Sequence, residues 1–262
     1  LTAMDLSIEA EVFGANVVMS EDEVPNVTGR LLTSAEDIAM LEVPSGDFGR
    51  GNLSLEVVCK LLNQSSRPKF IIGGMIGPYT LAARLFGVTE ALELTLLDNA
   101  SAHCLLEKTT GYLIEYARAF RSSGADAVCM AEPAAGLLWP EGLAEFSSAY
   151  VKRLIEEVET DDFKIILHNC GCSIEHLDAV IASGSGFLHF GEPLDVVEAL
   201  NRVPLDILIG GNLNPSDVFV TAESEDTYRM TSELLEKTSG CKNFILSSGC
   251  DIPPGNTLVN LD

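Results

Sequence analysis

A histidine and a cysteine two residues apart close one of the most apolar segments of the chain. In the stretch FKIILHNCG (163–171), three consecutive apolar residues lead into His168, Asn169 and Cys170. Side chains two positions apart on an extended chain lie on the same face, so His168 and Cys170 are expected to point in the same direction. Such a pair is either a packed core histidine beside an inert thiol or two ligands of one metal ion.

Two further side chains with metal-binding chemistry follow other apolar segments. Cys250 comes two residues after the end of the segment 243–248, and Glu192 comes two residues after a shorter segment, GFLHF (186–190). One imidazole and two thiolates, with a carboxylate or an exchangeable group in the fourth position, form a good tetrahedral zinc site. The ligands are spread over three strand ends, unlike the close pairs of a structural zinc knuckle. The sequence therefore predicts a catalytic zinc site with His168, Cys170, Cys250 and Glu192 as ligands.

Short apolar segments alternate with amphipathic helical patterns along most of the chain. Segments that are apolar throughout are typical of parallel strands buried on both faces under helices. Helical patterns are predicted, for example, over 90–120 and 174–183. The predicted strands are KFIIGG (69–74), DAVCMAE (126–132), FKIILHNC (163–170), GFLHF (186–190), DILIGG (206–211) and NFILSS (243–248).

The beginning of the chain adds a seventh predicted strand. DLSIEAEVFG (5–14) is interpreted as a strand leading into a helix or loop, and the next stretch as a hairpin with its turn at 21–25. Seven parallel strands are one short of a (β/α)8 TIM barrel, in which catalytic groups lie at the carboxyl ends of the strands. Because Leu1 stands almost at a strand, we expect the N-terminal segment and first barrel strand to be missing. No linker divides residues 1–262, which predicts a single domain.

The composition narrows the classes of function. The chain has 262 residues, of which 16 are basic and 39 acidic, and its formal net charge is −23. Such a surface repels the phosphates of nucleic acids and anionic lipids, so neither is expected as a partner. No apolar run approaches the roughly 18 residues that a membrane span needs. Seven scattered cysteines, several within apolar patterns, are typical of reduced thiols in a cytoplasmic enzyme.

Several stretches together resemble the uroporphyrinogen decarboxylase superfamily, and within it the methylcobamide:coenzyme M methyltransferases. The zinc site of cobalamin-independent methionine synthase is similar as well. The likeness covers nearly the whole chain. It is carried by MDLSIEAEVFGA (4–15), GGMIGPYTLAARLFG (73–87), EPAAGLLWPEGLAEFSSAYVKRLIEEV (132–158), HNCG (168–171) and SSGCDIPPGNTL (247–258).

This resemblance implies a reaction and a role for the metal. The enzyme would move a methyl group from a methylated corrinoid (methylcobamide), carried by a partner corrinoid protein, to a thiol such as coenzyme M. A free thiol has a pKa of about 8.5 and is mostly protonated at neutral pH, whereas Zn²⁺ deprotonates a bound thiol. The resulting zinc-bound thiolate would attack the methyl group. The resemblance and the spacing also imply that Glu192 leaves the metal when the substrate sulfur arrives.

Two alternatives stay open. Decarboxylases of the same superfamily carry a histidine where this chain has Cys250, lack the His-x-Cys pair, and tend to carry Asp-Ser-Trp where residues 132–134 read Glu-Pro-Ala. Asp5, however, falls where those decarboxylases carry their acidic residue, and it is retained with Glu192 as a candidate catalytic carboxylate. A non-catalytic barrel scaffold in a corrinoid-protein complex is the other alternative, and bound zinc with thiol-dependent methyl transfer would exclude both.

A glycine-rich segment, IIGGMIGPYTLA (71–82), is predicted to be a strand-to-helix turn. Amides near Gly73, Gly74 and Gly77 at a helix N-terminus could receive an anion such as the sulfonate of coenzyme M. Alternatively, these glycines only permit a tight turn. Tyr79 is expected either to line the mouth of the pocket or to pack there.

Two residues near the predicted ligands are assigned structural roles. His189 alternates with apolar residues inside its strand, which predicts a hydrogen-bonded histidine in the core or the barrel lumen. Cys172 lies two residues beyond Cys170, but Gly171 breaks the strand between them. Cys172 is therefore predicted to point away from the metal.

Overall fold

The computed structural model describes residues 5–21, 24–64, 70–253 and 258–261, and a six-stranded parallel sheet forms its centre. The strands follow one another in the order β3-β4-β5-β6-β7-β8. Each strand pairs with the next one in the sequence, which is the winding of a (β/α)8 barrel. Their bounds are β3 Ile72–Ile76, β4 Ala127–Ala131, β5 Lys164–Asn169, β6 Phe187–Phe190, β7 Leu208–Leu213 and β8 Phe244–Ser248.

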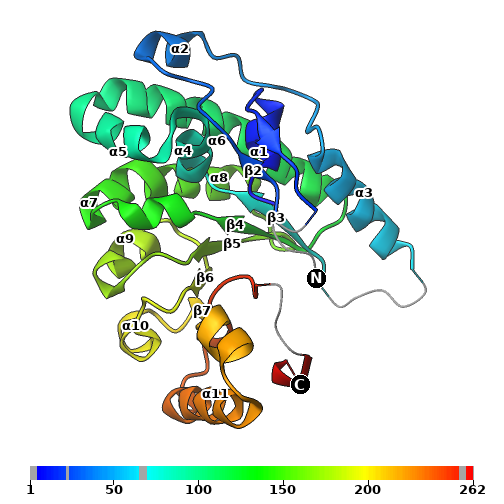
Figure 1. Cartoon of the computed structure of the whole chain (residues 1–262), viewed down its shortest axis with the longest axis vertical. Helices are drawn as coiled ribbons and strands as arrows, with labels where there is room; N and C mark the ends of the chain where they lie inside the picture. Colours follow the sequence, from blue (N-terminus) through cyan, green and yellow to red (C-terminus); the bar gives the residue numbers. More distant parts are fainter. Residues whose placement is uncertain (1–4, 22–23, 65–69, 254–257, 262) are drawn as a thin grey trace.

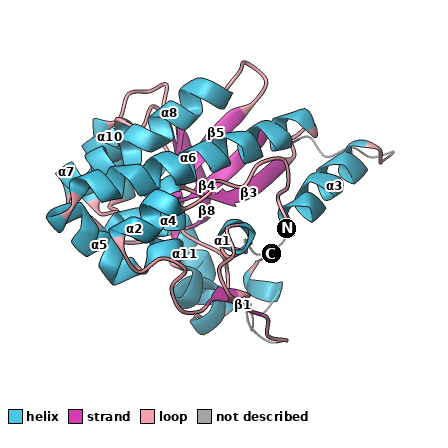
Figure 2. Cartoon of the chain, turned by 90° about the horizontal axis from the view of Figure 1, so that it is seen from above, coloured by secondary structure: helices cyan, strands magenta, loops and turns pink. Residues whose placement is uncertain are grey.

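Helices connect the strands and cover the outside of the sheet. Figure 1 shows the strands stepping from β3 to β7 with most helices on one flank, while α3 stands apart from them there and in the perpendicular view of Figure 2. The α-helices are α1 Ile8–Val12, α2 Ala35–Met40, α3 Gly51–Leu62, α4 Pro78–Phe86, α5 Val88–Leu97, α6 Asn99–Ser122, α7 Pro140–Leu143, α8 Ala149–Val158, α9 Leu177–Ile181, α10 Val196–Arg202 and α11 Ser224–Thr238. The 3-10 turns are η1 Pro133–Leu137, η3 Ile174–His176 and η5 Leu258–Asn260, and the π-helical turns are η2 Ala144–Ser148 and η4 Asp217–Thr221.

The six predicted strands from residue 69 onward are confirmed, with small shifts at their ends. The largest shift is in β3, which runs from Ile72 to Ile76, and Lys69 lies outside the described residues. The predicted helix over 90–120 is divided at Asp98, because the side chain of Asp98 accepts a hydrogen bond from the amide of Ser101 and caps a new helix there. Strand type was predictable because these segments are apolar on both faces.

The predicted strand over 5–14 is wrong, because this segment forms the short helix α1. Asp5 accepts hydrogen bonds from the amide and the hydroxyl of Ser7, at 2.9 and 2.6 Å, which turns the chain directly before the helix. The predicted hairpin is confirmed as β1 Val17–Val18 paired antiparallel with β2 Asn26–Val27. Its turn includes residues 22 and 23, which lie outside the described residues.

The barrel is therefore represented by six parallel strands. Within the described residues, no ladder joins β3 to β8, so the sheet is an open arc of the barrel. No helix in this part of the chain is both long enough and apolar enough to cross a membrane. The carboxyl ends of all six strands nevertheless meet at one rim, where the predicted site lies.

Glu9, on α1, is a buried carboxyl group with only one of its oxygens hydrogen bonded. Its side chain is 1% exposed, and Oε1 accepts a hydrogen bond of 2.9 Å from the amide of Ile76. Oε2 has no partner among the described residues. Burial raises the pKa of Glu9 from 4.5 to about 7, and the nearby charge of Asp5 acts in the same direction.

We expect Glu9→Gln to stabilise the protein at alkaline pH. Because the folded-state pKa of Glu9 is raised, its contribution to stability is fully present below pH 4.5 and is lost as the pH rises through about 7. Glutamine cannot ionise, so the variant should gain about 3 kcal/mol at pH 8 and much less at pH 5. Urea unfolding of both proteins at the two pH values measures the difference, and an equal gain at both would contradict this assignment.

Candidate metal centre

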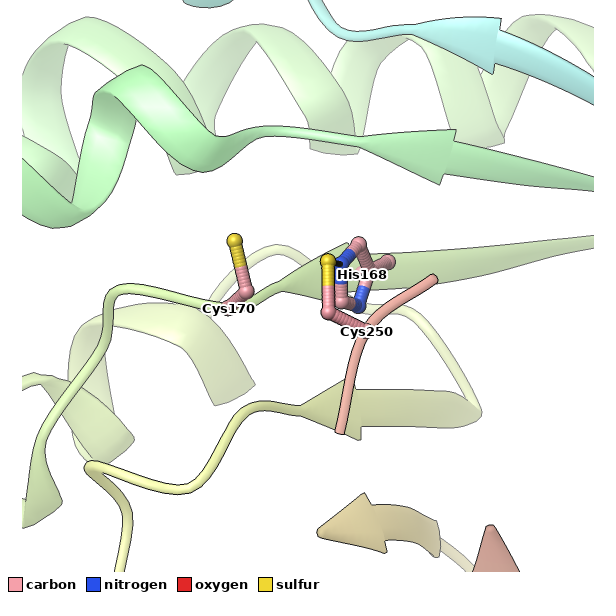
Figure 3. Close-up of side chains that lie close together, drawn as sticks. All are labelled: His168, Cys170 and Cys250. Atoms are coloured by element: carbon pink, nitrogen blue, oxygen red, sulfur yellow. Dashed lines mark hydrogen bonds between the residues drawn. The ribbon is translucent and has the colours of Figure 1, made fainter. Parts of the chain in front are cut away.

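Three of the predicted ligands converge at the carboxyl ends of the strands. His168 lies near the end of β5, Cys170 follows that strand, and Cys250 follows β8 (Figure 3). One ligand atom from each, a ring nitrogen or a sulfur, lies within 4.8 Å of the other two. Nε2 of His168 is 3.8 Å from Sγ of Cys250. Ligand atoms of a tetrahedral zinc ion are about 3.5–3.8 Å apart, so the distance between His168 and Cys250 fits such an ion.

The protonation of the two thiols also favours a cation between them. A hydrogen bond from Cys170, and a second contact with His168, lower the pKa of Cys250 well below the usual range of a thiol. The same hydrogen bond raises the pKa of Cys170, because a second thiolate would lie beside the first. A divalent metal would stabilise both thiolates at once. One imidazole and two thiolates are donors that zinc prefers, and they therefore fit the predicted ion.

Glu192, the fourth predicted ligand, is not part of this group. It is an exposed residue after β6, and its carboxylate is absent from the set of converging ligand atoms among the described residues. Its backbone does lie beside the loop of Cys250, because a Cβ atom added to Gly249 would be 3.1 Å from the amide nitrogen of Glu192. Its roles as a ligand and as a catalytic carboxylate stay predictions.

The N-terminus of α4, where the glycine-rich segment was predicted to receive an anion, already binds an anion of the protein, and the binding of a sulfonate there stays a prediction. The amides of Tyr79 and Thr80 donate hydrogen bonds of 2.9 and 2.8 Å to the carboxylate of Glu132. The Thr80 hydroxyl donates another, at 2.6 Å. Gly77 makes room for this carboxylate, since a Cβ atom there would lie 2.2 Å from Cγ of Glu132. The buried Glu132 thus occupies the place proposed for a sulfonate.

The other residues of that prediction have packing positions. Gly73 and Gly74 lie inside β3 rather than in the turn. A Cβ atom on Gly73 would come within 2.5 Å of the ring of Phe120, so the glycine permits close packing of α6 on the strand. Tyr79 is 2% exposed and packs in the interior, while its predicted role at the pocket stays a prediction.

Asp5 is held in a hydrogen-bond network that includes none of the three converging residues. Arg50 donates hydrogen bonds to the carboxylate of Asp5, to Glu11 and to the hydroxyl of Ser7. Although burial opposes ionisation, the bonds from Ser7 and Arg50 lower the pKa of Asp5. Asp5 is thus an ion-paired carboxylate, and its predicted catalytic role stays a prediction.

A second histidine contacts the metal group from the neighbouring strand. His189 on β6 is the register partner of His168, and their Nδ1 atoms are 2.8 Å apart. Nε2 of His189 is 2.8 Å from the hydroxyl of Ser247. Burial lowers the pKa of His189 to about 4, with a smaller effect from His168, so its ring is neutral at pH 7. The predicted hydrogen-bonded histidine is confirmed, but its contact with His168 was missed, since only the strand register reveals it.

Comparison with known proteins identifies the family of the chain. Residues 2–262 match the family described as Uroporphyrinogen decarboxylase (URO-D). The chain belongs to this family. Like other members it is built on a TIM barrel. The predicted membership of the uroporphyrinogen decarboxylase superfamily is thereby confirmed. This family contains both methyltransferases and decarboxylases, and individual relatives bear on the choice between them.

The relatives include both kinds of enzyme. The chain is 27% identical over 260 residues to the methylcobamide:CoM methyltransferase MtbA of Methanosarcina acetivorans, covering 98% of this chain and 75% of that protein. It is 27% identical over 219 residues to uroporphyrinogen decarboxylase 2 of Arabidopsis thaliana, covering 79% of this chain and 53% of that protein. A methyltransferase structure from Methanosarcina mazei has the same fold, with a TM-score of 0.86 at 24% identity, covering 98% of this chain and 75% of the other.

Proposed function

We propose that this chain is a zinc-dependent methyltransferase that moves a methyl group from a methylated corrinoid, carried by a partner corrinoid protein, to a thiol such as coenzyme M. The observation that carries the proposal is the convergence of His168, Cys170 and Cys250 in one group. The name of the MtbA relative supports both the corrinoid donor and the coenzyme M acceptor. The seven cysteines, all in the described ranges, are free thiols, which suits the reducing cytoplasm that we propose as its location.

The three side chains would hold the ion, and the two thiolates would also influence its chemistry. When bound, zinc supplies the Lewis acidity that lowers the pKa of a coordinated substrate thiol. The two thiolates of Cys170 and Cys250 reduce the net positive charge at the site, so they favour sulfur nucleophilicity over the activation of water. With three protein ligands, a bound zinc ion would have one position left for the acceptor, as in catalytic zinc sites.

Exposed apolar side chains beside the metal group support a large, flat methyl donor such as a corrinoid. The turn η1 lies against the Cys170 loop, because a Cβ atom on Gly136 would be 2.7 Å from the backbone of Gly171. Leu137, the last residue of this turn, is 59% exposed, and Trp139, two residues further on, is 39% exposed. Exposed apolar side chains of this kind suit contact with a macrocycle presented by a partner protein.

Methylcobalamin and coenzyme M test the proposed function directly. We expect zinc-loaded protein to demethylate methylcobalamin only when the thiol is present, with methylated thiol as the product. Chelator-treated protein should be inactive and should recover when zinc is restored. Zinc-replete protein without thiol-dependent demethylation would contradict the proposal, and decarboxylation of uroporphyrinogen would instead assign the chain to the decarboxylases.

A further inference from the structure

A line of hydrogen bonds leads from the metal group across the sheet to β8. It begins at Nδ1 of His168, which is 2.8 Å from Nδ1 of His189. Nε2 of His189 is 2.8 Å from Oγ of Ser247, and the Ser247 hydroxyl donates to the carbonyl oxygen of Ser248 at 3.1 Å. The line thus runs from the predicted metal ligand to a backbone carbonyl, which can only accept.

The direction of every bond follows from that carbonyl. Because the Ser247 hydroxyl donates to Ser248, its oxygen is free to accept the N–H at Nε2 of His189. A neutral imidazole carries one donor and one acceptor, so Nδ1 of His189 must accept from the N–H at Nδ1 of His168. These tautomers are assigned from the hydrogen-bond network. Nε2 of His168 then has a free lone pair, and it is the nitrogen that faces Cys250.

We infer that His189 is a positioning residue of the metal centre, which holds His168 in the rotation and tautomer that leave Nε2 free to bind a metal. The inference rests on the proposed zinc site and adds a residue that does not touch the ion. Metal-binding histidines commonly donate their second nitrogen to an outer partner, and here the acceptor is another histidine.

Gly210 on β7 keeps the path between His189 and Ser247 open. β7 lies between β6 and β8, and Gly210 is the register partner of His189. A Cβ atom on Gly210 would be 2.9 Å from Cδ2 of His189 and 2.8 Å from the ring of Phe187. A larger residue would therefore push the His189 ring from its place without touching the metal group.

Zinc affinity, measured by competition with a chromophoric chelator, tests the inference. We expect His189→Leu to lower affinity about 10–100-fold, which is the usual cost of losing an outer partner, and to change the visible spectrum of the Co²⁺-loaded protein. His189→Asn should recover most of the affinity and the spectrum, because Oδ1 of asparagine can accept near the place of Nδ1. Gly210→Ala should act like His189→Leu. His103→Leu, on the outer helix α6, is the control and should leave both unchanged.

The outcomes separate this inference from the proposed function. If the parent protein binds no zinc, the proposed function fails. If the parent binds zinc and His189→Leu binds it with equal affinity and an unchanged Co²⁺ spectrum, the inference alone is overturned. An asparagine variant as weak as the leucine variant would also overturn it. Should His189→Leu fail to fold, Ser247→Ala replaces it. Losing the acceptor at Nε2 frees His189 to change tautomer. Unchanged zinc affinity in Ser247→Ala would overturn the inference.

Discussion

We expect that replacing Cys250 with alanine will remove the proposed zinc ion and abolish the proposed thiol-dependent methyl transfer. Cys250 supplies one of only two sulfur atoms in the converging group, and it comes from a different strand end than His168 and Cys170. Without it, the other two ligands belong to a single segment and cannot enclose an ion. The loss of zinc affinity should therefore exceed the roughly 10–100-fold that an outer partner contributes. Elemental analysis should give about one zinc per chain for the parent protein and none for the variant.

Cys172 provides the matched control for this experiment. It is fully buried, lies two residues beyond Cys170, and does not belong to the converging group. We expect Cys172→Ala to keep its zinc and its activity, although it will lose some stability because a buried side chain is shortened. Zinc retained by Cys250→Ala, or lost equally from both variants, would contradict the assignment of Cys250 as a ligand.

The convergence of His168, Cys170 and Cys250 was predictable because both the residue types and the strands can be recognised in the sequence. Short apolar runs that alternate with helical patterns are typical of parallel strands, and parallel strands bring their carboxyl ends together. His168, Cys170 and Cys250 each stand at or just after the end of such a run. Their convergence therefore needed only the order of the strands and no knowledge of individual side-chain contacts.

The features that were missed depend on contacts between distant residues. Alternating apolar residues over 5–14 fit a short strand and a short helix equally well, and the side chain of Asp5 decides in favour of α1. The pairing of His168 with His189 requires the register of β5 against β6. The anion at the N-terminus of α4 comes from Glu132, which follows a different strand. Composition and periodicity do not encode these contacts.

Among the substitutions proposed, we expect Glu132→Ala to cause the largest loss in the free energy of unfolding. The carboxylate is fully buried and accepts four hydrogen bonds, from the amides of Tyr79 and Thr80 and from the hydroxyls of Thr80 and Ser147. Alanine would leave buried donors without an acceptor, at a cost of about 4 kcal/mol in the free energy of unfolding. Glu132→Gln should recover only part of the lost stability, because its NH₂ group would face one of these donors. Urea unfolding measures the stability of both variants. The exposed Glu141→Ala is the control, and its stability should be within about 0.5 kcal/mol of the parent.

Zinc binding should separate the effects of Glu132 and Cys250. The backbone amide of Glu132 donates to the carbonyl of His168 at 2.8 Å, and this bond does not depend on the side chain. Where Glu132→Ala is folded, it should therefore bind zinc in the same ratio as the parent, whereas Cys250→Ala should fold without zinc. If Glu132→Ala were as stable as Glu141→Ala, the amides of α4 would not need this carboxylate. The N-terminus of α4 would then again be a candidate site for the sulfonate of the acceptor thiol.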